Sequence, residues 1–293
     1  MNSGETPAVA RRRVRLAIRD ARNARSFTQT EVADAMEWSL SKVMRIESGE
    51  VTISQNDLRP LLAFLGIRDR AVVESLVQSA RVSRQRRWWD EARFKNMLTA
   101  ATKQLIAYEA EATVIRHFYP MFFPGVLQSE AYAQGIMGQY THELSQKEIE
   151  ARIQARLRRK AELLQRIPRP KVFTLLDESV LLRTIGVGQR ALGEQLAEVS
   201  EAIKDGWLVA RIHPFDNPHP GIGTFEILYL GSEELAHAVL YRESLTLDEI
   251  VDDHSRIKQH RDLWDRMWDA AIDAERSAEM IATRAKELLG ADQ

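Results

Sequence analysis

Apolar positions in the first eighty residues recur at spacings of three and four, which places them on one face of an α-helix. Polar residues typical of helix starts and ends separate these stretches. The pattern predicts five helices, over residues 10–24, 28–36, 39–47, 54–65 and 69–82. We expect them to close a small all-α domain over residues 10–80, after a disordered tail at residues 1–9.

Residues 28–49 are expected to form two short helices joined by a tight turn. Thr28 and Glu31 have the spacing of a capping box, and Ser39 is placed to cap the second helix. Val43 and Ile46 supply that helix with an apolar inner face. The outer face carries Leu40, Ser41, Lys42 and Arg45. Apolar backing with polar groups in front is what a helix that enters a DNA major groove requires.

Residues 14–67 resemble the helix-turn-helix (HTH) domain of lambda-repressor-like, xenobiotic-response-element (XRE) regulators, the Cro-type HTH class. The resemblance is carried by Thr28-Gln29, Glu31, Ala33, residues 39–42, and Arg45-Ile46-Glu47-Ser48-Gly49. It implies sequence-specific binding of double-stranded DNA and transcription regulation. The implied DNA-binding residues are Gln29, Ser39, Leu40, Ser41, Lys42 and Arg45.

Two positions depart from this family. Glu37 stands in the turn where the family usually has glycine, and a positive φ there costs a non-glycine residue roughly 1 kcal/mol. Leu40 stands where a polar side chain that reads bases is more common. Leu40 either touches a thymine methyl group or packs within the domain.

The charge distribution favours DNA binding although the chain has a net charge of −1. Seven arginines occur from residue 11 to residue 25, with Asp20 the single acidic residue among them. They form either an electrostatic footprint for phosphates or a solvated helix face. Beside an HTH pattern we favour phosphate contacts, with Arg11, Arg12, Thr28 and Thr52 as candidates.

A basic linker is predicted at residues 81–87, followed by a second domain over residues 88–293. Trp88 and Trp89 are interpreted as an anchor for this linker, with a ligand platform as the alternative. The second domain has helical patterns at residues 90–118, 129–138, 145–166, 189–203, 247–271 and 273–289. Strand patterns occur at residues 171–176, 207–212, 225–230 and 236–241. The predicted fold is therefore mainly α, with an α+β second domain of helices on a small, mostly antiparallel sheet.

Several segments of the second half resemble the C-terminal domain of a large group of bacterial regulators described as antitoxin-like. These segments are residues 108–112, 123–132, 176–178 and 219–221. The resemblance implies a regulator that is often encoded beside a small protein partner, to which this domain binds.

The remaining composition argues against other classes of function. The chain has no cysteine, which removes disulfides and thiolate metal sites, and it lacks the common nucleotide-binding, hydrolase and metalloprotease motifs. Several histidines and acidic residues could form a metal or catalytic site, but we favour a structural or surface role for them. They are His213, His219, residues 252–254 and the pair Asp177-Glu178. No apolar run is long enough to span a membrane. We expect a cytoplasmic protein that is not an enzyme and needs no cofactor or metal.

The leading hypothesis is a DNA-binding regulator that acts as a homodimer. Two or three base contacts at ~1–3 kcal/mol each fall short of the ~4–10 kcal/mol that separates specific from non-specific binding. Two copies on a near-palindromic site reach it. The alternative is an antitoxin-like interaction protein whose second domain captures a small partner. A third hypothesis makes the second domain an enzyme or a small-molecule sensor.

Overall fold

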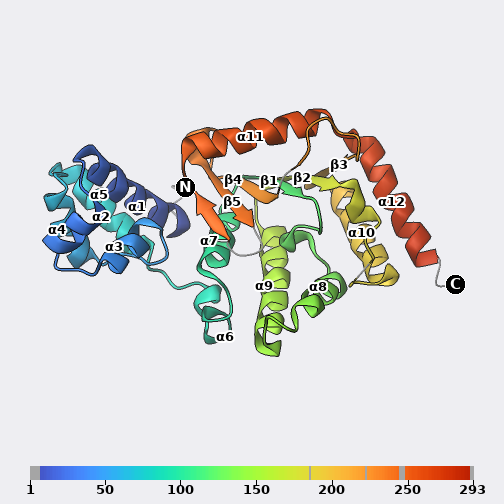
Figure 1. Ribbon diagram of the computed structural model, residues 1–293, viewed down its shortest axis with the longest axis horizontal. Helices are drawn as coiled ribbons and strands as arrows, with labels where there is room; N and C mark the ends of the chain where they lie inside the picture. Colours follow the sequence, from blue (N-terminus) through green and yellow to red (C-terminus); the bar gives the residue numbers. More distant parts are fainter. Residues whose placement is uncertain (1–6, 185, 222, 244–247, 291–293) are drawn as a thin grey trace. The chain divides into compact units, whose positions relative to one another are not determined.

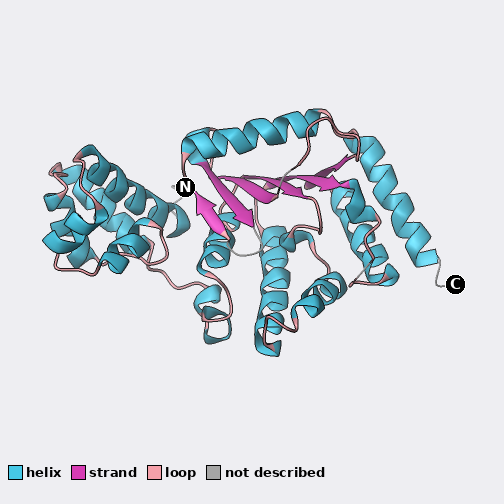
Figure 2. Ribbon diagram, viewed as in Figure 1, coloured by secondary structure: helices cyan, strands magenta, loops and turns pink. Residues whose placement is uncertain are grey.

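The computed structural model describes residues 7–184, 186–221, 223–243 and 248–290 (Figure 1). The chain divides into two compact units, Met1–Asp90 and Glu91–Gln293. Helices build the first unit, and the second combines helices with a sheet (Figure 2). The predicted fold class, mainly α with an α+β second part, is confirmed.

Among its described residues, the first unit contains five α-helices, as predicted. They are α1 (Pro7–Ala24), α2 (Gln29–Ala35), α3 (Leu40–Glu47), α4 (Gln55–Phe64) and α5 (Arg70–Val82). The predicted disordered tail is wrong at residues 7–9, which belong to α1, and its residues 1–6 lie outside the described part. Proline is favourable at the first position of a helix, which explains why α1 begins at Pro7.

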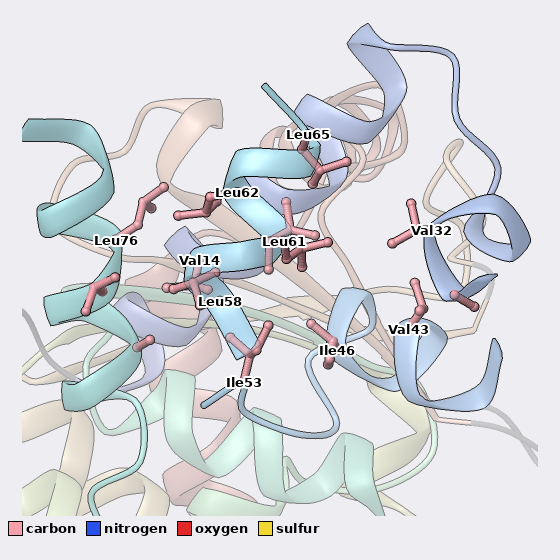
Figure 3. Packing of buried hydrophobic residues seen from close by; sticks show 14 residues of the cluster. Val14, Val32, Val43, Ile46, Ile53, Leu58, Leu61, Leu62, Leu65 and Leu76 are labelled. Carbon is pink, nitrogen blue, oxygen red and sulfur yellow. The ribbon is translucent and has the colours of Figure 1, made fainter. Parts of the chain in front are cut away.

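One apolar cluster joins the five helices (Figure 3). Val14 of α1, Val32 of α2 and Val43 of α3 meet the leucines of α4 in this cluster. Each of these residues lies on the helix face that the sequence periodicity indicates. The cluster therefore fixes the rotation of every helix about its own axis, including that of α3.

The predicted basic linker at residues 81–87 overlaps α5, which includes Arg81 and Val82. Three arginines follow α5 up to residue 87, and then comes a short 3₁₀ helix, η1 (Trp88–Asp90). Trp88 and Trp89 meet edge to face, with ring centroids 5.4 Å apart. Their role as a linker anchor stays a prediction.

The second unit contains seven further α-helices among its described residues. They are α6 (Ala92–Lys95), α7 (Ala100–Glu109), α8 (Glu130–Met137), α9 (Gln146–Gln165), α10 (Gln189–Lys204), α11 (His254–Asp269) and α12 (Ala274–Gly290). Short 3₁₀ segments are η2 (Gly125–Leu127), η3 (Gly138–Tyr140), η4 (Glu178–Leu181) and η5 (Leu235–His237). The predicted helices at residues 129–138, 145–166, 189–203 and 273–289 correspond to α8, α9, α10 and α12.

Six strands form one mixed sheet in the order β3-β2-β1-β4-β5-β6. The strands are β1 (Val114–Tyr119), β2 (Lys171–Asp177), β3 (Leu208–His213), β4 (Thr224–Tyr229), β5 (Ala238–Glu243) and β6 (Glu249–Val251). β1 pairs in parallel with β2, and β2 with β3, whereas the β1–β4, β4–β5 and β5–β6 pairs are antiparallel. Three of the five pairings are antiparallel.

Helices cover both faces of this sheet (Figure 1). The α11 face has an apolar centre, in which Phe118 of β1 and Ile227 of β4 pack with Trp264 and Met267. Behind the opposite face, Arg159 of α9 makes a buried two-point ion pair with Glu109 of α7, at 2.7 and 2.6 Å. Burial alone lowers the pKa of Arg159, but the facing Glu109 carboxylate outweighs that effect, so the pKa is raised.

The single long helix predicted at residues 90–118 is wrong. Thr99 caps a separate helix, α7, and residues 114–119 form β1, which lies inside the sheet. The β1 sequence VIRHFY is rich in β-branched and aromatic residues and is buried along most of its length, as suits a central strand. The helix predicted at residues 247–271 also begins too early, because residues 249–251 pair with β5 as β6.

Candidate nucleic-acid interface

The turn between α2 and α3 has the geometry of a helix-turn-helix. Glu37 has φ 55°, so it adopts the left-handed conformation that the missing glycine predicted. The Trp38 amide donates to the Ala33 carbonyl at 2.8 Å, and the Glu37 amide donates to the Asp34 carbonyl at 3.2 Å. This pair of bonds closes the end of α2 in a Schellman motif. The Ser39 hydroxyl then accepts from the Lys42 amide at 3.2 Å and starts α3.

A buried carboxylate ties three helices together at the back of α3. Glu47 is 5% exposed and accepts two bonds from Arg22 of α1, at 2.7 and 2.9 Å. It also accepts from the Gln29 amide group of α2 at 2.8 Å. The hydrogen bond with Glu47 raises the pKa of Arg22 above its usual value, so Arg22 stays charged. We call Arg22, Gln29 and Glu47 the Glu47 clamp. It holds α3 against α1 and α2 by direction-specific bonds, in addition to the apolar core.

The outer face of α3 is exposed. It is formed by Leu40, Ser41, Met44, Arg45 and Ser48. These positions are spaced i, i+1, i+4, i+5 and i+8, so they lie on one side of the helix. Val43 and Ile46 are buried on the other side (Figure 3). The helix that was expected to face DNA therefore presents a continuous accessible surface within its own unit.

Two of the predicted base contacts already have partners in the protein. The Lys42 ammonium lies 3.1 Å from Asp57 and 3.7 Å from the centre of the Trp38 ring. The Arg45 guanidinium lies 3.4 Å from Glu50, and both side chains of this pair are about half exposed. An exposed ion pair contributes ~0–1 kcal/mol. The ion pair with Glu50 therefore holds Arg45 only weakly, and its contact with a base stays a prediction.

The other predicted contacts take part in local structure. The Thr28 hydroxyl forms the predicted capping box with Glu31, and Thr52 is half-buried in the loop after α3. The Gln29 amide is held by Glu47. Their assignment as DNA contacts stays a prediction.

The arginines of α1 also make contacts within the first unit. Arg11 donates to the Ser83 carbonyl at 3.5 Å, and Arg13 donates to the Ser75 hydroxyl at 2.8 Å. Arg12 is 8% exposed. Arg11 and Arg13 therefore attach α1 to α5 and the residue that caps it. Phosphate binding by Arg11 and Arg12 stays a prediction.

Sequence reasoning missed the Glu47 clamp and the exposure of Met44. A signal for the clamp exists, because Arg22 continues the apolar series Val14 and Ile18 at a spacing of four. Glu47 likewise follows Ile46 on the buried side of α3. An arginine on the apolar face of one helix and a glutamate on the apolar face of another together indicate a buried ion pair. The exposure of Met44 follows from its position four residues after Leu40.

In the second unit, Asp177 lies at the end of β2 and accepts from the Ser179 amide at 3.0 Å, so it caps η4 as the structural reading expects. The His213 ring is 3.6 Å from Asp177, and its other nitrogen lies 2.9 Å from the His219 carbonyl. Asp253 caps α11. Across the described ranges, no three His, Asp or Glu side chains gather as a metal site requires.

Among the residues that the structure describes, no helix is both long enough and apolar enough to cross a membrane.

Comparison with known families gives two matches. A helix-turn-helix domain model matches residues 14–76, which include α2, the turn and α3. A model described as a domain of unknown function, DUF5753, matches residues 102–283. No curated protein and no solved structure matches the chain. The description of neither matching model names a catalytic activity. The second match covers more than half of the chain, so the chain belongs to the DUF5753 family, and it carries an HTH domain of the kind found in DNA-binding regulators.

Proposed function

We propose that this DUF5753-family chain is a sequence-specific transcription regulator of the XRE class, which reads its operator with the outer face of α3. The observation that supports it most is the orientation of α3. Val43, Ile46 and the Glu47 clamp hold one side of the helix, and Ser41 and Arg45 are exposed on the other. In this proposal α3 is the recognition helix, Arg45 binds guanine, and the protein is not an enzyme.

The active form in this proposal is a homodimer on a near-palindromic site. One recognition helix of eight residues offers few base contacts, and each contributes ~1–3 kcal/mol. Specific binding needs ~4–10 kcal/mol over non-specific binding, which two helices supply together. The second unit provides the dimer contacts and the regulatory surface. The half-sites then lie about one helical turn apart, or a multiple of it.

The test begins with selection of a binding site from random DNA by the full chain. Arg45→Ala should weaken binding to the selected site and relax the preference at one base pair in each half-site. Arg59→Ala is the matched control, because it removes the same charge from an exposed ion pair on α4. Arg59→Ala should retain the base preference. An unchanged preference in Arg45→Ala would contradict the assignment of α3, and half-sites without symmetry would contradict the dimer.

A second candidate function is capture of a small protein partner by the second unit, and one surface feature favours it. Three exposed apolar side chains follow the ends of the adjacent parallel strands β1, β2 and β3. They are Met121, Leu182 and Phe215, and Phe215 is 67% exposed. A stoichiometric partner that co-purifies with the full chain should be lost in Phe215→Ser. It should be retained in Tyr140→Ser, which changes an exposed aromatic residue elsewhere in the unit. Equal retention by both variants would contradict this role of the strand ends.

A further inference from the structure

Two large apolar side chains are exposed on the outer face of α3. Leu40 is 42% exposed and Met44 is 50% exposed. Among the described residues of the first unit, the exposed large apolar side chains are these two and Val72 of α5. Leu40 and Met44 are four residues apart and therefore neighbours on one helix face.

The polar groups around this pair are largely engaged within the protein. Lys42 is bound to Asp57, and the Ser39 hydroxyl caps α3. Ser41 and Arg45 share the outer face with the pair. A ligand that covers this face must therefore offer apolar groups beside hydrogen-bonding ones.

The major groove of DNA offers this combination at one base. The thymine C5 methyl is the apolar group on its floor, and it lies beside the hydrogen-bonding base edges. Four residues of an α-helix span about 6 Å along the axis. Base pairs are stacked about 3.4 Å apart. Leu40 and Met44 can therefore reach methyl groups that are one or two base steps apart.

We propose that Leu40 and Met44 select thymines through their methyl groups, so that each half-site contains one or two required thymines beside the base that Arg45 reads. This inference rests on the proposed function, because it assumes that α3 enters the major groove. It assigns Met44, which carries no hydrogen-bonding group suited to a base edge, as a specificity residue.

The test replaces each thymine of the selected site by uracil, one position at a time. Uracil lacks the methyl group and keeps the same Watson–Crick pairing. Losing one buried methyl should weaken binding about fourfold at one or two positions in each half-site. Leu40→Ala and Met44→Ala should each abolish the uracil effect at one of these positions. Val72→Ala, on another helix, should leave every uracil effect unchanged. Circular dichroism checks that the variants keep their helix content.

The outcomes separate this inference from the proposed function. A site that is selected and depends on Arg45, but tolerates uracil at every position, overturns the inference and leaves the regulator intact. Uracil effects that persist in the Leu40→Ala, Met44→Ala double variant also overturn it, because the methyls are then recognised elsewhere. If the chain enriches no DNA sequence at all, the proposed function fails and the inference fails with it.

Discussion

Replacing Glu47 with alanine should loosen the attachment of α3 to α1 and α2. The substitution removes a carboxylate that accepts three hydrogen bonds, two from Arg22 and one from Gln29. It leaves the Arg22 guanidinium without its counter-ion, while the side chain of Arg22 is only 14% exposed. Breaking a buried pair by removing one partner costs about 3–5 kcal/mol. Arg22 keeps some contact with water and one bond to the Phe27 carbonyl, so we expect the lower end, about 3 kcal/mol.

The assay is hydrogen exchange of the full chain, read on peptides from α2 and α3. Exchange through local opening reports the free energy of that opening. A loss of about 3 kcal/mol should accelerate exchange there by roughly a hundredfold. The matched control is Glu50→Ala, which removes an exposed carboxylate just beyond α3. Surface changes of this kind shift stability by about 0.5 kcal/mol at most.

A double variant separates the clamp from simple loss of packing. Arg22→Leu with Glu47→Leu removes both charges and fills the space with apolar side chains, which should restore most of the protection. If Glu47→Ala accelerates exchange by no more than Glu50→Ala does, the Glu47 clamp does not stabilise α3. The same conclusion follows if the double variant is as unprotected as the single one.

Three further changes test other parts of the account. Glu37→Gly should stabilise the first unit by about 0.5–1 kcal/mol in urea unfolding without changing base preference, because glycine adopts φ 55° without strain; a loss of stability would contradict this. Glu50→Gln should tighten binding to the selected DNA site a few-fold in a gel-shift titration, because it frees Arg45 of α3 and, if α3 binds DNA as proposed, removes a negative charge that would repel phosphates; weaker binding would contradict this. Arg159→Met should destabilise the second unit by about 3–5 kcal/mol in thermal unfolding, and adding Glu109→Leu should recover most of it; no recovery would count against the buried pair.

The first unit could be predicted almost entirely from local signals. Its caps, Thr28, Ser39 and Ser54, start helices where the sequence places them. Its apolar stripes converge in one cluster. The left-handed conformation of Glu37 is what the family resemblance implies, because glycine usually stands at this position of the turn. Local propensity and tertiary packing agree in the five helices of this unit, which makes them predictable.

The second unit was harder because packing overrides local pattern at β1. The residues before it have helical spacing, and no glycine or proline separates α7 from the strand. β1 becomes a strand because it is hydrogen-bonded to β2 on one side and β4 on the other. Those partners lie far along the chain, at residues 171–177 and 224–229, and single-sequence periodicity does not contain that information.

In the candidate site, the direction of a side chain is predictable from the sequence, whereas its bonding partner is not. The direction of Ser41 and Arg45 follows from helix periodicity, because Val43 and Ile46 fix the buried side. The partners of Gln29 and Lys42 do not follow from it, since Glu47 and Asp57 come from other helices or turns of the chain. Side-chain bonds between elements depend on their final arrangement, so the sequence indicates which groups are available and the fold decides which are used.

Chemical protection of guanine N7 on the selected operator shows whether α3 binds in the major groove. Guanine N7 lies in the major groove, whereas adenine N3 lies in the minor groove, so dimethyl sulfate distinguishes the two surfaces. We predict protection of a guanine N7 in each half-site, and loss of that protection in Arg45→Ala but not in Arg59→Ala. Protection of adenine N3 alone, or guanine protection that survives in Arg45→Ala, would contradict this prediction.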